Sequence, residues 1–101
     1  MLPQYDEMPV AEAEEKVEQP KLYKVLLHND DYTTMEFVVE ILEAIFNMPE
    51  DQAIQVMLNV HVRGVGVAGI YTFEVAEMKV AKTIAAARDQ EYPLLCTMEE
   101  A

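Results

Sequence analysis

Two parts of the sequence carry side chains that could bind a charged group or perform chemistry. The first is the run Asn29-Asp30-Asp31, and the second is His61. An amide oxygen, a carboxylate and a neutral imidazole nitrogen all accept hydrogen bonds, whereas an ammonium group offers three donors. Asn29, Asp31 and His61 could therefore hold an ammonium group. Alternatively, Asp30, Asp31 and His61 could ligate a metal ion, or the aspartates could simply form a turn.

The sequence gives little support to a catalytic nucleophile. Serine is absent, which excludes a serine triad. Cys96 is the single cysteine, and its apolar surroundings favour a buried thiol over a reactive one. Gly64, Gly66 and Gly69 do not have the spacing of a nucleotide-binding loop. We therefore predict no catalytic residue and no enzymatic activity. Two adjacent aspartates and one distant histidine are a weak metal signal, so we predict no metal site or cofactor either.

The chain is short and acidic. Its 101 residues are enough for one domain, and its formal net charge is −12 at pH 7. Such a surface repels nucleic acids and anionic membranes, so neither is an expected partner. A single cysteine fits a reducing compartment, and no signal peptide or membrane-spanning run is recognisable. We therefore expect a cytoplasmic protein.

The acidic residues are concentrated at the N-terminus. Residues 1–20 carry six acidic side chains against one lysine, together with three prolines. This composition predicts a flexible acidic tail, either functional or merely solubilising, which ends at Pro20. The folded domain is then predicted to comprise residues 21–101.

Periodicity within that domain predicts the element order strand, helix, helix, strand, helix, strand. The predicted ranges are 22–28, 33–47, 49–63, 65–71, 72–90 and 94–98. Thr33 and Glu36 have the spacing of a capping box at the start of the first helix, and Gly64 can end the second. Because the strands alternate with helices, we expect an α+β domain whose helices cover one face of a sheet.

The second predicted helix also places apolar residues beside His61. Met57, Val60 and His61 share one face through their spacing of four and three residues. Met57 and Val60 could line a cavity next to a captured ammonium group, or they could belong only to the hydrophobic core. Periodicity does not distinguish these two possibilities.

Several separate motifs resemble the ClpS family of N-end rule adaptors. The resembling segments are residues 23–27, 29–33, 35–38, 57–58, 60–61, 72, 74–77, 79–81 and 93–97. They occur in order over residues 21–101, and a flexible N-terminal tail is also a feature of the family. The resemblance implies a three-stranded antiparallel sheet with three helices packed on one face. It also implies an adaptor that binds N-degron substrates by a free α-amino group and a bulky apolar first residue.

The resemblance assigns roles to individual residues. It implies that Asn29, Asp31 and His61 bind the substrate α-amine. The implied side-chain pocket consists of Asp30, Thr33, Met35, Val38, Met57, Val60 and Leu94. Met35 would exclude β-branched first residues from this pocket.

The resemblance also implies a partner. Glu74 and Lys79 would dock on the N-terminal domain of a Clp AAA+ unfoldase, of the ClpA or ClpC type, and the tail would enter the unfoldase during delivery. Two residues depart from the family pattern, namely His28, which could contact the pocket wall, and Thr34, where proline is common. The alternative functions are a metal-dependent enzyme and a structural interaction domain resembling the C-terminal domain of the ribosomal stalk protein.

Overall fold

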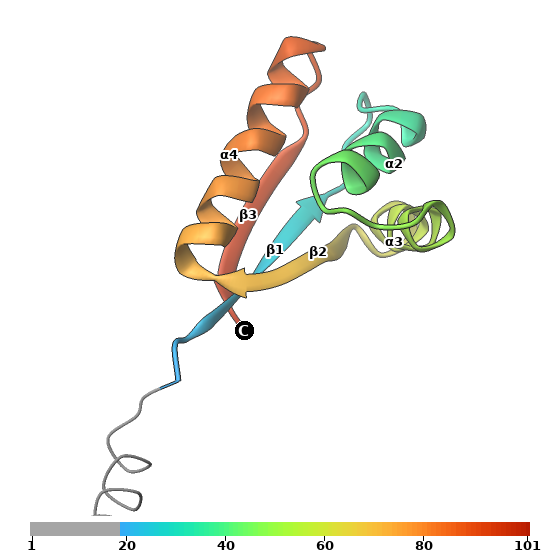
Figure 1. The fold of residues 1–101 in the computed structure, drawn as a ribbon. Coiled ribbons are helices and arrows are strands. Elements are labelled where there is room, and N and C mark those ends of the chain that lie inside the picture. Colours follow the sequence, from blue (N-terminus) through green and yellow to red (C-terminus); the bar gives the residue numbers. More distant parts are fainter. Residues whose placement is uncertain (1–18) are drawn as a thin grey trace, which may run out of the picture.

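The computed structural model describes residues 19–101 as a three-stranded sheet with three helices (Figure 1). The elements are β1 (Leu22–His28), α2 (Met35–Ala44), α3 (Glu50–Arg63), β2 (Val65–Thr72), α4 (Phe73–Asp89) and β3 (Leu95–Glu100). Their order confirms the predicted fold. Of the tail predicted for residues 1–20, residues 1–18 lie outside the described part. Within residues 19–101, no helix is long and apolar enough to cross a membrane.

The sheet has the order β2-β1-β3, and both pairings are antiparallel. This order places the first strand of the chain at the centre of the sheet. His28, the last residue of β1, is paired with Val65 at the start of β2 and with Leu95 at the start of β3. The turn that follows β1 therefore begins beside the C-terminal end of α3.

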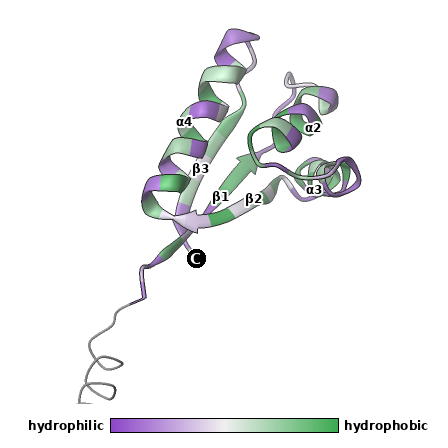
Figure 2. Ribbon diagram, in the orientation of Figure 1, coloured by the Kyte–Doolittle hydropathy of each residue, from purple (hydrophilic) through white to green (hydrophobic). Residues whose placement is uncertain are grey.

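The two faces of β1 have different environments. Val25 and Leu27 are fully buried in a core that includes residues from all three helices. Figure 2 shows an apolar stretch in β1, whereas the helices combine apolar and polar residues. The alternation of a strand directs Leu26 and His28 to the opposite face, and both are only half-buried. The helices therefore cover one face of the sheet and leave the other open.

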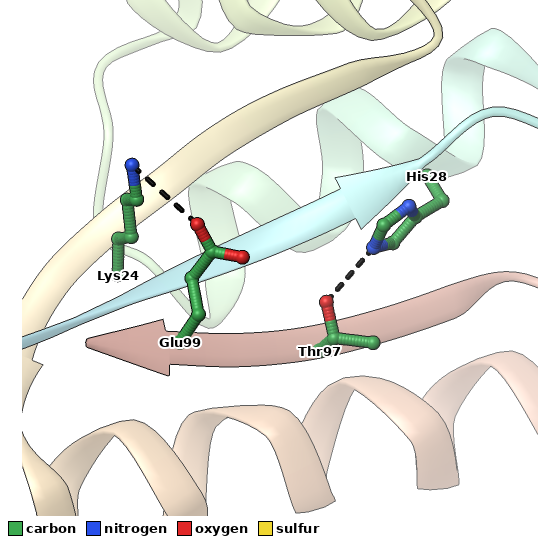
Figure 3. Close-up of polar contacts among 4 residues, drawn as sticks. All are labelled: Lys24, His28, Thr97 and Glu99. Carbon is green, nitrogen blue, oxygen red and sulfur yellow. Dashed lines mark hydrogen bonds and ion pairs between the residues drawn. The ribbon is translucent and has the colours of Figure 1, made fainter. Parts of the chain in front are cut away.

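His28 lies on this open face and does not line the cavity described below. Its Nε2 atom is 2.8 Å from the Thr97 hydroxyl on β3, and Lys24 forms an ion pair of 3.6 Å with Glu99 on the same face (Figure 3). The possibility that His28 contacts the pocket wall is therefore wrong. The reason is strand parity, because the neighbouring Leu27 points into the core.

The start of α2 also differs from the prediction. Thr34, not Thr33, is the N-cap, and its hydroxyl accepts a hydrogen bond of 3.1 Å from the Phe37 amide. The amide and hydroxyl of Thr33 instead donate to Asp30, which places Thr33 in the turn before the helix. Glu36 consequently stands one position too early to complete a capping box.

Helix α3 ends as predicted at Gly64, which has a φ of 89° and needs no β-carbon in this left-handed conformation. Pro49, however, is the N-cap and not the first helical residue. Two residues after Gly64, the chain passes closely under α3. A β-carbon on Gly66 would lie 2.7 Å from Cγ2 of Val60.

We expect Gly66→Ala to destabilise the domain by about 1–3 kcal/mol, because Val60 is 2% exposed and has little room to move away. Chemical denaturation of the variant and the parent measures this difference. Equal free energies of unfolding would contradict the close packing of β2 against α3.

Candidate functional site

A cavity of about 460 Å³ opens between the turn after β1, the start of α2 and the last turns of α3. It is lined by Asn29, Asp30, Asp31, Tyr32, Thr33, Thr34, Met35, Glu36, Val38, Met57, Val60 and His61. These include nine of the ten residues predicted for the amine and side-chain sites. The exception is Leu94, which is a core residue and does not line the cavity.

Main-chain hydrogen bonds bring the two halves of the predicted amine site together. The Asn29 amide donates to the Gly64 carbonyl at 2.9 Å, immediately beyond the pairing of His28 with Val65. Gly64 caps α3, and His61 is in the last turn of that helix. The left-handed conformation of Gly64 therefore places the turn after β1 beside His61.

The carboxylate of Asp30 organises this turn. Oδ1 accepts hydrogen bonds from the Tyr32 amide at 2.8 Å and the Thr33 amide at 2.7 Å, and Oδ2 accepts one from the Thr33 hydroxyl at 2.8 Å. Partial burial tends to raise the pKa of Asp30, but these hydrogen bonds outweigh it and lower the pKa. The contribution of the carboxylate to the turn is therefore complete at neutral pH and is lost only as the pH falls through the lowered pKa.

With Asp30 engaged in the turn, two neighbouring polar side chains remain exposed at the cavity. Asn29 and Asp31 are both exposed, as is His61 on the opposite side. These three groups supply an amide, a carboxylate and an imidazole to one cavity. Together they can accept hydrogen bonds from a cationic donor.

The apolar part of the cavity is shared with the hydrophobic core. Val38 of α2 is 6% exposed and Val60 of α3 is 2% exposed, and both line the cavity. Val60 and Met57 therefore pack with the hydrophobic core and also line the cavity. Met57 is half-buried, whereas Met35 at the start of α2 is 42% exposed. The cavity thus has a rigid apolar base, and a flexible thioether side chain stands near its solvent-exposed part.

The cavity contains three further residues that were not predicted. Tyr32, Thr34 and Glu36 line it together with their predicted neighbours. All three lie within the continuous segment 29–36, and each of the eight residues of this segment lines the cavity. Each stands between residues that were predicted for the site, and this position in the sequence could have identified them.

The alternative of a metal site has no support in residues 19–101, where no three His, Cys, Asp or Glu side chains are grouped suitably for a metal ion. The carboxylate of Asp30 is directed to the backbone and hydroxyl of its own turn. Asp31 and His61 alone are too few protein ligands for a typical site.

The thiol of Cys96 is placed for packing. The residue is 3% exposed in β3, and burial raises the pKa of its thiol to about 11. The reactive thiolate is therefore scarce at neutral pH.

We expect a thiol-reactive probe at pH 8 to label Cys96 about a hundred-fold more slowly in the native protein than in denaturant, because burial both lowers the thiolate fraction and blocks access. The rate of absorbance change with an aromatic disulfide reagent measures this. Equally fast labelling in the native and denatured states would show that the Cys96 thiol is accessible and reactive.

The two predicted docking residues occupy different environments. Glu74 is exposed in the first turn of α4. The ammonium of Lys79 instead donates to the Ile45 carbonyl, and it lies 5.9 Å from the ring centroid of Phe46 and 5.6 Å from that of Tyr71. Lys79 therefore ties α4 to the connection between α2 and α3, in part through cation–π attraction.

The fold and the cavity define a small α+β binding domain in which polar acceptors adjoin an apolar cavity. A sequence model of the family described as ATP-dependent Clp protease adaptor protein ClpS matches residues 18–97. The chain belongs to this ClpS family of Clp protease adaptors.

Individual relatives agree with this assignment. The ClpS adapter of Methylococcus capsulatus is 56% identical over 96 residues, which cover 95% of this chain and 91% of that protein. The ClpS adapter of Caulobacter vibrioides is 55% identical over 91 residues, which cover 90% of this chain and 84% of that protein. The structure of Agrobacterium tumefaciens ClpS2 bound to L-phenylalaninamide has a TM-score of 0.79 and 40% identity, and the match covers 82% of this chain and 100% of that one.

Proposed function

We propose that this chain binds N-degron proteins through their free α-amino group and a bulky apolar first side chain: Leu, Phe, Tyr or Trp. In this proposal it acts in the cytoplasm, performs no catalysis itself, and delivers its cargo to a Clp AAA+ unfoldase and protease. The observation that carries the proposal is the single cavity in which Asn29, Asp31 and His61 adjoin the apolar side chains of Val38, Met57 and Val60.

The chemistry of the cavity supports this cargo. The exposed acceptors suit an ammonium group, whereas the apolar residues suit the side chain attached to the same α-carbon. Burying a Leu or Phe side chain contributes about 1.5–3 kcal/mol. The ligand of the Agrobacterium relative, L-phenylalaninamide, combines a free amine with an aromatic side chain. The net charge of −12 also favours a cationic N-terminus over an anionic ligand.

A titration with peptides that differ only in their first residue tests the proposal. Peptides beginning with Leu, Phe, Tyr or Trp should bind at least about ten-fold more tightly than peptides beginning with Gly or Ala, because small side chains leave the apolar cavity unfilled. Fluorescence anisotropy measures the affinities. Equal binding of all these peptides would favour the alternative of a general interaction domain.

Delivery is proposed to require the exposed end of α4. Because Glu74 is exposed, we expect Glu74→Lys to abolish delivery to the unfoldase while leaving peptide affinity and stability unchanged. Degradation of a reporter by the reconstituted unfoldase and protease measures delivery. Normal degradation with this variant would place the docking surface elsewhere.

The expected effect of replacing Lys79 is different, because its ammonium contacts the carbonyl of Ile45 and two aromatic rings. Lys79→Ala should lower stability by about 1–3 kcal/mol as well as affect delivery. Unchanged stability would show that these internal contacts contribute little. Glu74→Lys is therefore the cleaner test of docking.

The tail of residues 1–20 is proposed to enter the unfoldase during delivery. Deletion of residues 1–18 should leave peptide binding unchanged, since every residue that lines the cavity lies between 29 and 61. Reporter degradation should nevertheless fail. A truncated protein that delivers at the parent rate would leave only a solubilising role for the tail.

A further inference from the structure

A second apolar groove adjoins the cavity. It lies between α2 and α3, has a volume of about 470 Å³, and is lined by Met35, Glu36, Val39, Glu40, Glu43, Ile54 and Met57. Met35, Glu36 and Met57 also line the first cavity. The groove and the cavity therefore adjoin at these three residues.

The groove combines apolar and acidic side chains. Val39 of α2 is half-buried and Ile54 of α3 is 40% exposed, so both present aliphatic surface. Glu36, Glu40 and Glu43 are exposed on the same side of α2, because their spacing of four and three residues aligns them along one helix face. None of the residues that line the groove is basic.

The charges around the groove are unbalanced over a wider region. Residues 25–62 contain seven Asp and Glu residues and no Lys or Arg. Two ion pairs occur within residues 19–101, and both lie away from the groove. They join Lys21 to Glu100 and Lys24 to Glu99, between β3 and the N-terminal part of β1 or the residue before it. The glutamates of the groove therefore have no basic partner in the described part of the chain, and they attract positive charge from a bound molecule.

We propose that this groove is a second subsite, which accepts a Lys or Arg side chain from residue two or three of the bound protein. The inference rests on the proposed function and extends it to the sequence that follows the first residue. An extended chain advances about 3.3–3.6 Å per residue, so residues two and three lie within reach of a groove that shares Met35 and Met57 with the cavity. The aliphatic stem of a basic side chain then packs on Val39 and Ile54, and its charged end approaches Glu40 and Glu43.

Three peptides that begin with leucine and carry a pair of Lys, Gln or Glu residues at positions two and three test this subsite. The parent protein should bind the Lys peptide about three- to ten-fold more tightly than the Gln peptide, and the Glu peptide more weakly still. The double variant Glu40→Lys/Glu43→Lys should lose or reverse this order. Its affinity for the Gln peptide should remain within about two-fold of the parent, because neither glutamate lines the first cavity.

A matched control separates the groove from the overall acidity of the protein. Glu77→Lys/Asp89→Lys makes the same change in net charge at exposed positions on α4. This control should keep the preference for the Lys peptide. Loss of the preference in both double variants to the same extent would overturn the subsite in favour of long-range attraction.

The remaining outcomes separate the subsite from the proposed function. Equal affinities of the parent for the Lys, Gln and Glu peptides would overturn the second subsite alone. A parent protein that binds none of the three peptides would overturn the proposed function, and the subsite with it.

Discussion

Asp31→Ala is expected to weaken the binding of a peptide with a free amine and a leucine first residue by about ten-fold or more. The carboxylate of Asp31 is exposed at the cavity, whereas that of Asp30 is held in its own turn. A hydrogen bond to a charged group contributes about 1.5–3 kcal/mol, which corresponds to this change in affinity. Isothermal titration calorimetry measures the dissociation constants.

Two controls show whether the loss arises from the amine. Asp89→Ala removes one negative charge from the last residue of α4 and should leave affinity unchanged. The acetylated form of the same peptide should bind Asp31→Ala and the parent equally, because it has no ammonium for Asp31 to bind. If Asp31→Ala binds the free peptide as tightly as the parent does, Asp31 is not an amine ligand.

Met35→Ala is expected to admit peptides that begin with Ile or Val while retaining those that begin with Leu or Phe. Attraction to an apolar cavity does not reject β-branched residues, so rejection requires a steric element. Met35 lies at the first residue of α2, beside the turn that carries Asn29 and Asp31, and it lines the cavity. A branch at the substrate Cβ lies close to the captured amine, where a methionine side chain would collide with it.

Overpacking of this kind costs about 1–3 kcal/mol, so Met35→Ala should improve the binding of Ile and Val peptides by roughly ten- to a hundred-fold. Anisotropy titrations with Leu, Phe, Ile and Val peptides measure the change. Met78→Ala, an exposed methionine on α4, is the matched control and should retain the parent specificity. Continued rejection of Ile and Val by Met35→Ala would show that another residue of the cavity is the gate.

Much of this architecture was predictable because it depends on local patterns. The order of strands and helices follows from periodicity, and the end of α3 follows from Gly64. The proximity of the predicted amine-binding residues was available through the family resemblance. The structure adds the physical link, which is the hydrogen bond from the Asn29 amide to the Gly64 carbonyl.

The incorrect predictions concern side chains with more than one available partner. Thr33 and Thr34 both have the chemistry of an N-cap, and the choice depends on the carboxylate of Asp30. Lys79 is a different case: its docking role stays a prediction, but the fold also brings the Ile45 carbonyl and two aromatic rings to its ammonium. Local patterns do not contain such long-range contacts. The orientation of His28 was nevertheless accessible from strand parity.

The central claim is that the cavity recognises a free α-amine together with the first side chain. Two leucine peptides that differ only in acetylation of that amine test it most directly. Acetylation removes the positive charge and leaves Asn29, Asp31 and His61 without a cationic partner, so the dissociation constant should rise by about ten-fold or more. Equal dissociation constants for the free and acetylated peptides would contradict the claim.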